Sequence, residues 1–391
     1  MRILYASERP PYPFFLGGAA RCAHRLLHAL ACELHVECSA VGSNEYRTTP
    51  WSYPDPSDHA ALGVLGIERS QHDGSIDCGY PCRVIADFAQ GLDELIEAQR
   101  PDIVWAQLEG AKLVLESARR KGVVGLLFVH DAEFDPVELR AIGALGCHVV
   151  CSSAFLAKKA SKVIGRKAHV VYPCPETDFG VAGDAQGHIT MINPHRVKGI
   201  DTFFEIAKRM PSERFLLVES WRLPEQALKD LNERLTGASN VRFVRRVSDM
   251  QPIYGQTKLL LVPSVWEEGF GMVAVEAQSC GIPVIASARG GLPESVGDGG
   301  LLIDDYLDAE AWVEAIGRVL GDPTRYAAFA TKASQHAAAE KFSVAYSARR
   351  FKDVCASKAP ATGALSRRIG DLLHRVGGLR DVRGLVRRAR R

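Results

Sequence analysis

The sequence predicts an α/β protein made of two doubly wound halves that face each other across a cleft. Short runs rich in Val, Ile and Leu alternate with longer amphipathic stretches from residue 1 to about residue 320, a pattern typical of parallel sheets covered by helices. A segment of Pro, Gly and acidic residues at 173–188 interrupts the series and predicts an interdomain linker. Because ligands bind at the carboxyl ends of such strands, we expect the functional site in the cleft.

In the first half, strand patterns and amphipathic stretches follow one another in regular order. Predicted strands cover 2–7, 35–42, 103–107, 124–130, 147–153 and 169–173, and predicted helices lie near 18–31, 88–99, 111–121 and 154–163. Residues 43–82 are rich in Pro, Ser, Asp and His and lack periodicity, which predicts an irregular insertion that carries substrate contacts. Cys147 and Cys151 fall on one face of their strand, so we expect both to pack in the core.

The second half repeats the pattern after the linker. Its predicted strands cover 189–193, 214–219, 241–247, 258–263, 283–287 and 300–303. A helix is expected to begin at about Gly271, shortly after the strand at 258–263.

Composition excludes several classes of protein. Of the 391 residues 47% are hydrophobic and 24% charged, with a net charge of +2, so a disordered or collagen-like chain and a polycation built for nucleic acid are ruled out. The first residues carry charges and prolines where a secretory signal needs an apolar core, and we expect a cytoplasmic protein. The ten cysteines are expected to be reduced thiols, and their spacing does not fit a structural metal site.

The end of the chain has a different character. Residues 366–391 hold nine Arg and two Asp, a balance of +7, which leaves −5 for the remaining 365 residues. Apolar residues recur there at helical spacing with Arg between them. This basic tail is therefore either a solvated segment or an amphipathic helix that lies on an anionic membrane surface.

The strongest local pattern lies between Trp266 and Glu294. Glu268 and Glu276 are eight positions apart, and the predicted helix places Glu276 in its second turn, where it points into the cleft. Gly271 lets backbone N–H groups approach a ligand, and the positive helix start favours an anion such as a diphosphate. Carboxylates beside such an anion are suited to bind sugar or ribose hydroxyls.

The same segment closely resembles the hallmark of the family-four retaining nucleotide-sugar glycosyltransferases, which have the two-domain GT-B fold. That hallmark is two Glu separated by seven residues, followed by Ala-Xaa-Xaa-Cys/Ala-Gly-Xaa-Pro-Val and Gly-Gly-Xaa-Xaa-Glu. This chain has Glu268-Gly269-Phe270-Gly271, Glu276-Ala277, Cys280-Gly281-Ile282-Pro283-Val284, Gly290-Gly291 and Glu294.

The resemblance assigns donor-binding roles in this segment. It implies that Glu268 contacts the donor sugar and that Glu276 holds the donor ribose. Phe270 and Gly271 offer backbone amides near the sugar and phosphate. The neighbouring Gly269 and Met272 belong to the same donor-binding set.

A second stretch, residues 192–210, is similar to the first strand and loop of the family's donor domain. Lys198 stands where the family's Lys neutralises the donor diphosphate, and a compact point charge suits a departing phosphate. The family's usual Arg is replaced by Asn193, while Arg196 stands inside the loop and is a second candidate for the diphosphate. Arg246 and Val247 end a strand where the family binds the base.

The first half carries two further resemblances. Gly17 and Gly18 lie between a strand and a helix, like the Gly-Gly loop that faces the donor diphosphate and the acceptor. His130 follows a buried strand, where the family often has a histidine near the reacting sugar carbon. We therefore expect Lys198, Glu268, His130 and Arg196 to carry the chemistry.

The resemblance implies a metal-independent retaining hexosyltransferase whose substrates are a nucleotide-diphosphate sugar and a glycan, lipid-linked or small-molecule acceptor. The expected domains are an acceptor-side Rossmann-like domain (1–173), a donor domain (174–345), a helix that packs back toward the first domain (346–362) and the basic tail (363–391). No cofactor, metal or nucleic acid is expected. The tail suggests polysaccharide biosynthesis at the inner face of a membrane. Two alternatives remain: a nucleotide-sugar epimerase or phosphorylase of the same fold, and a noncatalytic two-lobed binding protein.

Overall fold

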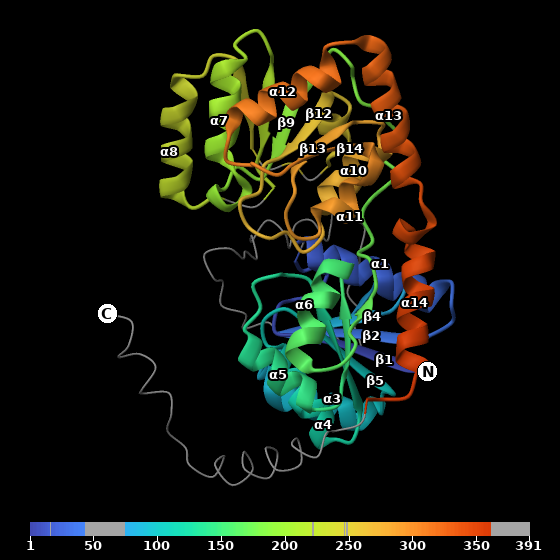
Figure 1. Ribbon diagram of the computed structural model, residues 1–391. Helices are drawn as coiled ribbons and strands as arrows, with labels where there is room; N and C mark the ends of the chain where they lie inside the picture. The colour runs from blue at the N-terminus through green and yellow to red at the C-terminus, as the bar shows by residue number, and fades with distance from the viewer. Residues whose placement is uncertain (16, 44–74, 221–222, 246, 248, 361–391) are drawn as a thin grey trace.

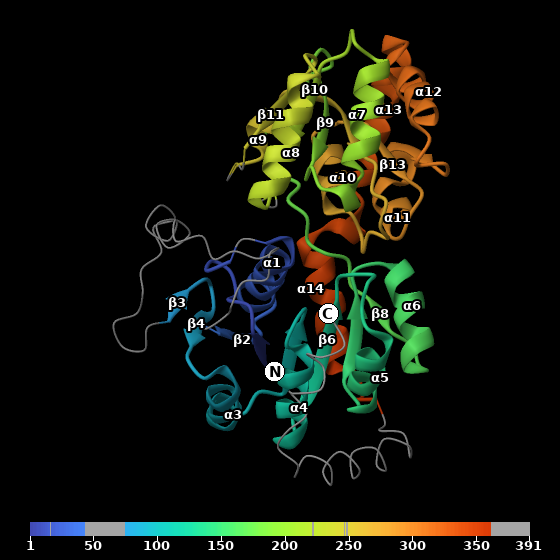
Figure 2. The same ribbon diagram turned by 90° about the vertical axis from the view of Figure 1, so that its left-hand side faces the viewer.

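The computed structural model describes residues 1–15, 17–43, 75–220, 223–245, 247 and 249–360. Two α/β lobes lie one above the other, each built around its own sheet (Figures 1 and 2). The fold class predicted from the sequence is confirmed. We call the part around the first sheet the N-terminal lobe and the part around the second sheet the C-terminal lobe.

The N-terminal lobe contains an eight-stranded sheet in the order β3-β4-β2-β1-β5-β6-β7-β8. Its strands are β1 (Arg2–Ser7), β2 (Glu37–Ser43), β3 (Ile76–Asp77), β4 (Pro81–Ile85), β5 (Ile103–Gln107), β6 (Val124–Val129), β7 (His148–Cys151) and β8 (His169–Val170). Its helices are α1 (Gly18–Cys32), α3 (Phe88–Gln99), α4 (Ala111–Arg120), α5 (Pro136–Ala144) and α6 (Ala154–Ile164). Every pairing is parallel except that of β3 with β4.

Strand alternation separates two apolar cores in this lobe. Ile3 and Tyr5 of β1 pack with side chains of α1 and of α14 (Val344–Ala356). Leu4 and Ala6 point the other way and pack with α3, α4 and α6. Both faces of the strand are therefore buried, which explains its continuous apolar sequence.

The C-terminal lobe contains a six-stranded parallel sheet in the order β11-β10-β9-β12-β13-β14. The strands are β9 (His188–Ile192), β10 (Phe215–Val218), β11 (Val241–Val244), β12 (Thr257–Val262), β13 (Val284–Ser287) and β14 (Gly300–Ile303). The helices are α7 (Ile200–Arg209), α8 (Glu225–Thr236), α9 (Gln251–Tyr254), α10 (Met272–Ser279), α11 (Leu292–Val296), α12 (Ala309–Leu320) and α13 (Pro323–Ala337). Short 3₁₀ helices are η1 (Arg196–Lys198), η2 (Gly297–Gly299) and η3 (Glu340–Phe342).

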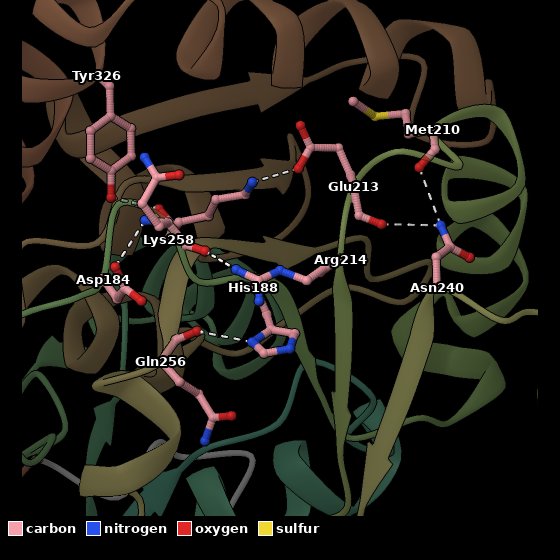
Figure 3. Close-up of polar contacts among 10 residues, drawn as sticks. Asp184, His188, Met210, Glu213, Arg214, Asn240, Gln256, Lys258 and Tyr326 are labelled. Carbon is pink, nitrogen blue, oxygen red and sulfur yellow. Dashed lines mark hydrogen bonds and ion pairs between the residues drawn. The ribbon is translucent and has the colours of Figure 1, made fainter.

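Polar contacts hold together the amino-terminal edge of this second sheet, as Figure 3 shows. Asn240, just before β11, donates from its amide nitrogen to the carbonyl oxygen of Met210 at 3.2 Å. The Tyr326 hydroxyl of α13 donates to the carbonyl oxygen of Lys258 in β12 at 3.0 Å. These contacts lie at the strand ends remote from the carboxyl edge, which leaves that edge for the functional loops.

The chain crosses between the lobes twice. Residues 171–187 connect β8 to β9, and after η3 the chain returns to the N-terminal lobe as α14, which packs against α1 (Figures 1 and 2). Phe351 of α14 is fully buried and lies 4.7 Å from the Trp105 ring, centroid to centroid. A helix that follows the C-terminal lobe in the sequence thus completes the core of the first lobe.

Two sequence expectations about this lobe need correction. Residues 43–82 are not wholly irregular, because β3 and β4 add two strands to the sheet; β3 is only two residues long and β4 begins with Pro81, so neither shows a clear alternating pattern. Helix α5 was not expected, although Asp135 caps it and Pro136 opens it. Most of the insertion, residues 44–74, lies outside the described residues, as does the tail at 363–391.

The cysteine prediction holds. Cys147 and Cys151 are both buried in the same apolar core on one face of the first sheet. All ten cysteines are free thiols, and all but Cys32 are buried.

Candidate active site between the lobes

The site lies where two neighbouring strands of the second sheet end. β9 leads into η1, which carries Lys198, and β12 leads into the loop that carries Glu268. Gly199 allows these segments to pack together: its φ is +84°, and a Cβ there would lie 1.8 Å from the carbonyl oxygen of Pro263. Only glycine fits this position.

Lys198 and Glu268 form a buried ion pair. The Lys198 ammonium lies 2.7 Å and 2.9 Å from the two carboxylate oxygens of Glu268, with side chains only 11% and 9% exposed. The ammonium also lies 4.4 Å from the centre of the Trp266 ring, where a cation–π attraction holds it. The structure therefore joins two residues that the sequence assigned to the chemistry separately.

The surroundings of Glu268 favour its ionised form. Burial raises the pKa of this carboxyl, but the Lys198 charge, with hydrogen bonds from Lys198, Ser264 and Trp266, lowers the pKa below its ordinary value. The Ser264 hydroxyl donates directly to the carboxylate. Glu268 is thus an anion held in a fixed orientation at neutral pH.

His130 enters from the other lobe, directly after β6. Its ring stacks on Phe128 with centroids 4.2 Å apart, and its Nε2 lies 2.9 Å from the Gln107 side-chain oxygen. The Gln107 amide nitrogen donates to the Tyr5 hydroxyl at 3.0 Å and to the Ala19 carbonyl at 3.1 Å. The amide oxygen therefore faces the ring, which assigns the proton to Nε2 and leaves Nδ1 as an acceptor.

Burial lowers the pKa of His130 to about 4. The ring is consequently neutral at pH 7, so its Nδ1 is able to accept a hydrogen bond. The sequence analysis predicted His130 but missed Gln107. Gln107 is the last residue of β5, and that position at a strand end could have indicated a site residue.

The backbones of the two lobes meet beside this histidine. A Cβ placed on Gly269 would lie 1.8 Å from the carbonyl oxygen of His130 and 3.4 Å from a methyl carbon of Leu156 in α6. Glycine at 269 therefore lets the loop that carries Glu268 approach the end of β6.

Two helix amino termini also meet at the interface. Gly17 is the N-cap of α1 and Gly271 the N-cap of α10, and neither helix has a side-chain cap or an acidic residue in its first turn. A Cβ on Gly18 would lie 3.5 Å from the Met272 methyl carbon, which places the two termini side by side. Their N–H groups and dipoles together favour an anion.

Glu276 lies in α10, as predicted, and accepts a hydrogen bond from the Tyr254 hydroxyl at 2.9 Å. Burial raises the pKa of the Glu276 carboxyl, and the Tyr254 hydrogen bond and the charge of Arg21 from α1 oppose that rise. Tyr254 is a contact that sequence reasoning missed.

The remaining predicted residues have differing surroundings. Arg196 is exposed, whereas Lys198 two positions later is buried. Phe270 is buried, and its ring packs against Tyr172 and Phe342. Val247 is partly buried in an apolar cluster. Arg246 lies outside the described residues.

Two features are absent from the described part of the chain. Among those residues, no group of three or more His, Cys, Asp or Glu side chains is placed to hold a metal ion. Within the same ranges, no helix has both the length and the apolar character that crossing a membrane requires.

Comparison with known proteins finds similarity in the second half of the chain. Residues 193–336 match the family described as glycosyl transferases group 1. The D-inositol 3-phosphate glycosyltransferase of Mycobacteroides abscessus is 37% identical over 171 residues, which cover 41% of this chain and 37% of that protein. The enzyme of the same name from Salinispora tropica is 41% identical over 114 residues, which cover 28% of this chain and 23% of that protein. The matches thus span well under half of these relatives.

Solved structures agree over nearly the whole chain. HepE from Anabaena, in complex with UDP-glucose, superposes with a TM-score of 0.73 at 17% identity, covering 92% of this chain and all of that one. The catalytic domain of starch synthase IV from Arabidopsis thaliana, bound to ADP and acarbose, superposes with a TM-score of 0.64 at 13% identity. The match covers 90% of this chain and 98% of that one. These likenesses establish the shared fold.

Both lobes together have the GT-B architecture that the motif predicted. Residues 193–336 are similar to the glycosyl transferases group 1 family.

Proposed function

We propose that this protein is a retaining hexosyltransferase that moves a sugar from a nucleotide-diphosphate sugar to a glycan, lipid-linked or small-molecule acceptor. The observation that carries the proposal is the buried Lys198–Glu268 pair at the interface of the lobes, together with the starts of α1 and α10, which have no side-chain cap. The named relatives, which are glycosyltransferases, support it. Residues 1–173 form the acceptor side in this proposal, and 174–345 form the donor side.

The proposed reaction depends on charge stabilisation. The donor diphosphate binds at the adjacent helix starts near Gly18 and Gly271, where N–H groups and dipoles offset its charge. When the glycosidic bond breaks, negative charge grows on the diphosphate, and Lys198 stabilises it from a site already organised by Glu268. Arg196, exposed on the same loop, is a second candidate for this task.

Carboxylates and the histidine hold the neutral parts of the donor. Glu268, ionised and fixed, accepts hydrogen bonds from sugar hydroxyls, and Glu276 accepts from the ribose. His130 accepts from a sugar hydroxyl at Nδ1, because its proton lies on Nε2. The backbone N–H groups of Phe270 and Gly271 bind near the sugar and phosphate, and Val247 and Arg246 border the base.

Retention of configuration is proposed from the Glu268–Glu276 motif. The alternative functions, an epimerase or phosphorylase and a noncatalytic binding protein, are supported by none of the relatives named above. They also predict different behaviour: an epimerase needs no acceptor, a phosphorylase requires phosphate, and a binding protein turns nothing over.

The experiment that tests the proposal is an NMR assay of product formation. The purified protein is incubated with α-linked UDP-, GDP- and ADP-sugars and a panel of glycan, lipid-linked and small-molecule acceptors. We expect one donor to be consumed only when an acceptor is present, with an α-linked product. A β-linked product would refute retention, and donor isomerisation without acceptor would establish the epimerase instead.

We further propose that transfer needs no divalent metal, since Lys198 and the two helix starts supply the positive charge that a metal would otherwise provide. The transfer rate is expected to be unchanged in excess EDTA. Complete loss of activity that returns when Mg²⁺ or Mn²⁺ is added would contradict this.

We also propose that the protein is cytoplasmic and peripheral at the inner face of a membrane, in polysaccharide biosynthesis, with docking through residues 363–391. The net charge of +7 over 366–391 supports this, since each basic residue near an anionic surface contributes roughly 1 kcal/mol. Anionic vesicles should sediment the full chain but not a chain that ends at residue 362. Equal sedimentation of both would refute docking through the tail.

A further inference from the structure

We propose that Glu294 is a positioning residue that holds the two lobes in the arrangement in which transfer occurs. Glu294 belongs to α11 of the C-terminal lobe, yet its carboxylate binds the N-terminal lobe. One oxygen accepts from the backbone N–H of Ala154 and the other from that of Phe155, both at 2.8 Å. The Tyr172 hydroxyl, in the segment between the lobes, donates to the same carboxylate at 3.1 Å.

These bonds complete the start of α6. The first N–H groups of a helix have no partner within the helix. Ser153, the N-cap, accepts from the N–H of Leu156 at 3.1 Å, and Glu294 satisfies the N–H groups of Ala154 and Phe155. A carboxylate at a helix start gains both charge-assisted hydrogen bonds and a favourable dipole. The C-terminal lobe therefore supplies the acceptors for two N–H groups that Ser153 does not satisfy.

On the C-terminal side, the segment that carries Glu294 is packed directly on Glu268. The N–H of Gly291 donates to the carbonyl oxygen of Glu268 at 2.8 Å. A Cβ on Gly290 would lie 2.2 Å from that same oxygen, so the two backbones are in contact. A displacement of α11 is thus transmitted to the residue that holds Lys198.

On the N-terminal side, α6 is connected to His130. It follows β7, which pairs with β6, and the N–H of Ser152 donates to the carbonyl oxygen of Val129 at 3.1 Å. His130 is the next residue after Val129. Glu294 consequently fixes the position of Glu268 relative to His130, which belong to different lobes.

A second contact across the interface offers a matched comparison. Lys159 of α6 and Glu267 lie 2.7 Å apart, and their side chains are 39% and 38% exposed. Exposed ion pairs contribute little. The loss of Glu267 is therefore expected to leave both the arrangement of the lobes and the rate nearly unchanged.

The inference rests on the proposed function, and the test separates the two. Glu294→Gln keeps the size of the side chain but turns an NH₂ group toward a backbone N–H. We expect kcat for transfer to fall about tenfold or more, as for a lost charged hydrogen bond, while the dissociation constant for the nucleotide diphosphate changes less than about twofold. For Glu267→Gln, both kcat and this dissociation constant should stay within about twofold of the wild-type values.

Small-angle X-ray scattering supplies a readout that needs no activity. The Glu294→Gln protein should show a larger radius of gyration than wild type and the Glu267→Gln control, with an unchanged circular dichroism spectrum. Wild-type scattering with wild-type kcat would overturn the inference, as would equal losses in kcat and nucleotide affinity. If the wild-type protein transfers no sugar, the proposed function fails, and the scattering alone still decides the role of Glu294.

Discussion

Replacement of Lys198 by alanine is expected to reduce the rate of transfer by about two to three orders of magnitude, the usual effect of removing a group that stabilises developing charge. Unlike a surface lysine, Lys198 is buried with both Glu268 oxygens at its ammonium. Single-turnover kinetics at saturating donor give the measurement. A wild-type rate in this variant would remove the electrostatic account of the reaction.

The same change is expected to destabilise the protein by about 3 kcal/mol, because it leaves the Glu268 carboxylate buried without its cation. The double variant Lys198→Met, Glu268→Gln removes both charges and serves as the control. Its thermal midpoint should return close to that of wild type while its activity stays lost. This outcome would separate the catalytic loss from the loss of stability.

The sign of the pH dependence follows from the lowered pKa of Glu268. In wild type, the pair contributes fully above the ordinary glutamate pKa of 4.5, and this stability is lost as pH falls through the lower folded value. In Lys198→Ala, the ionised carboxylate is a penalty that protonation removes. The stability difference between the two proteins should therefore shrink on acidification.

Gly269→Ala is expected to lower the rate of transfer about 10²-fold while each lobe remains folded. The added carbon would lie 1.8 Å from the carbonyl oxygen of His130, against about 3.3 Å for a close contact of this kind. The lobes must part by more than about 1 Å, and a misplacement of that size has this effect on catalysis. Steady-state kinetics together with thermal unfolding test it.

Gly317 in α12 provides the matched control. An added Cβ there meets nothing within 4 Å, and the residue lies inside a helix. Gly317→Ala should keep full activity and gain a few tenths of a kcal/mol or more in stability. If Gly269→Ala keeps wild-type kcat, close approach of the two backbones is not required for transfer.

Local sequence was sufficient for much of the fold. β1 and β14 match their predicted limits, because each is a short apolar run beside residues that break strands. α10 begins at Met272, directly after the predicted Gly271, because the φ of +89° at this glycine is not helical. β3 and β4 escaped prediction because their edge pairing depends on a partner strand that local periodicity does not reveal.

The sequence predicted single residues of the site from local motifs, but it did not predict the contacts between distant segments. Lys198 and Glu268 each carry a local motif, but nothing local in their segments says that they touch, since the contact spans 70 positions. Gln107 and Tyr254 belong to no motif, and they contact His130 and Glu276 only because the strand and the helix that carry them place them there. Glu294 stood in the motif, yet its partners in α6 lie about 140 positions away.

The central claim is that the site between the lobes holds an activated sugar by its diphosphate, and calorimetry tests it most directly. UDP-, GDP- and ADP-sugars and the matching nucleoside monophosphates are titrated into the wild-type protein. We predict that at least one nucleotide-diphosphate sugar binds, and that its monophosphate binds at least about tenfold more weakly because the helix starts hold the missing phosphate. Association with none of these compounds, or equal affinity for the monophosphate, would contradict the account.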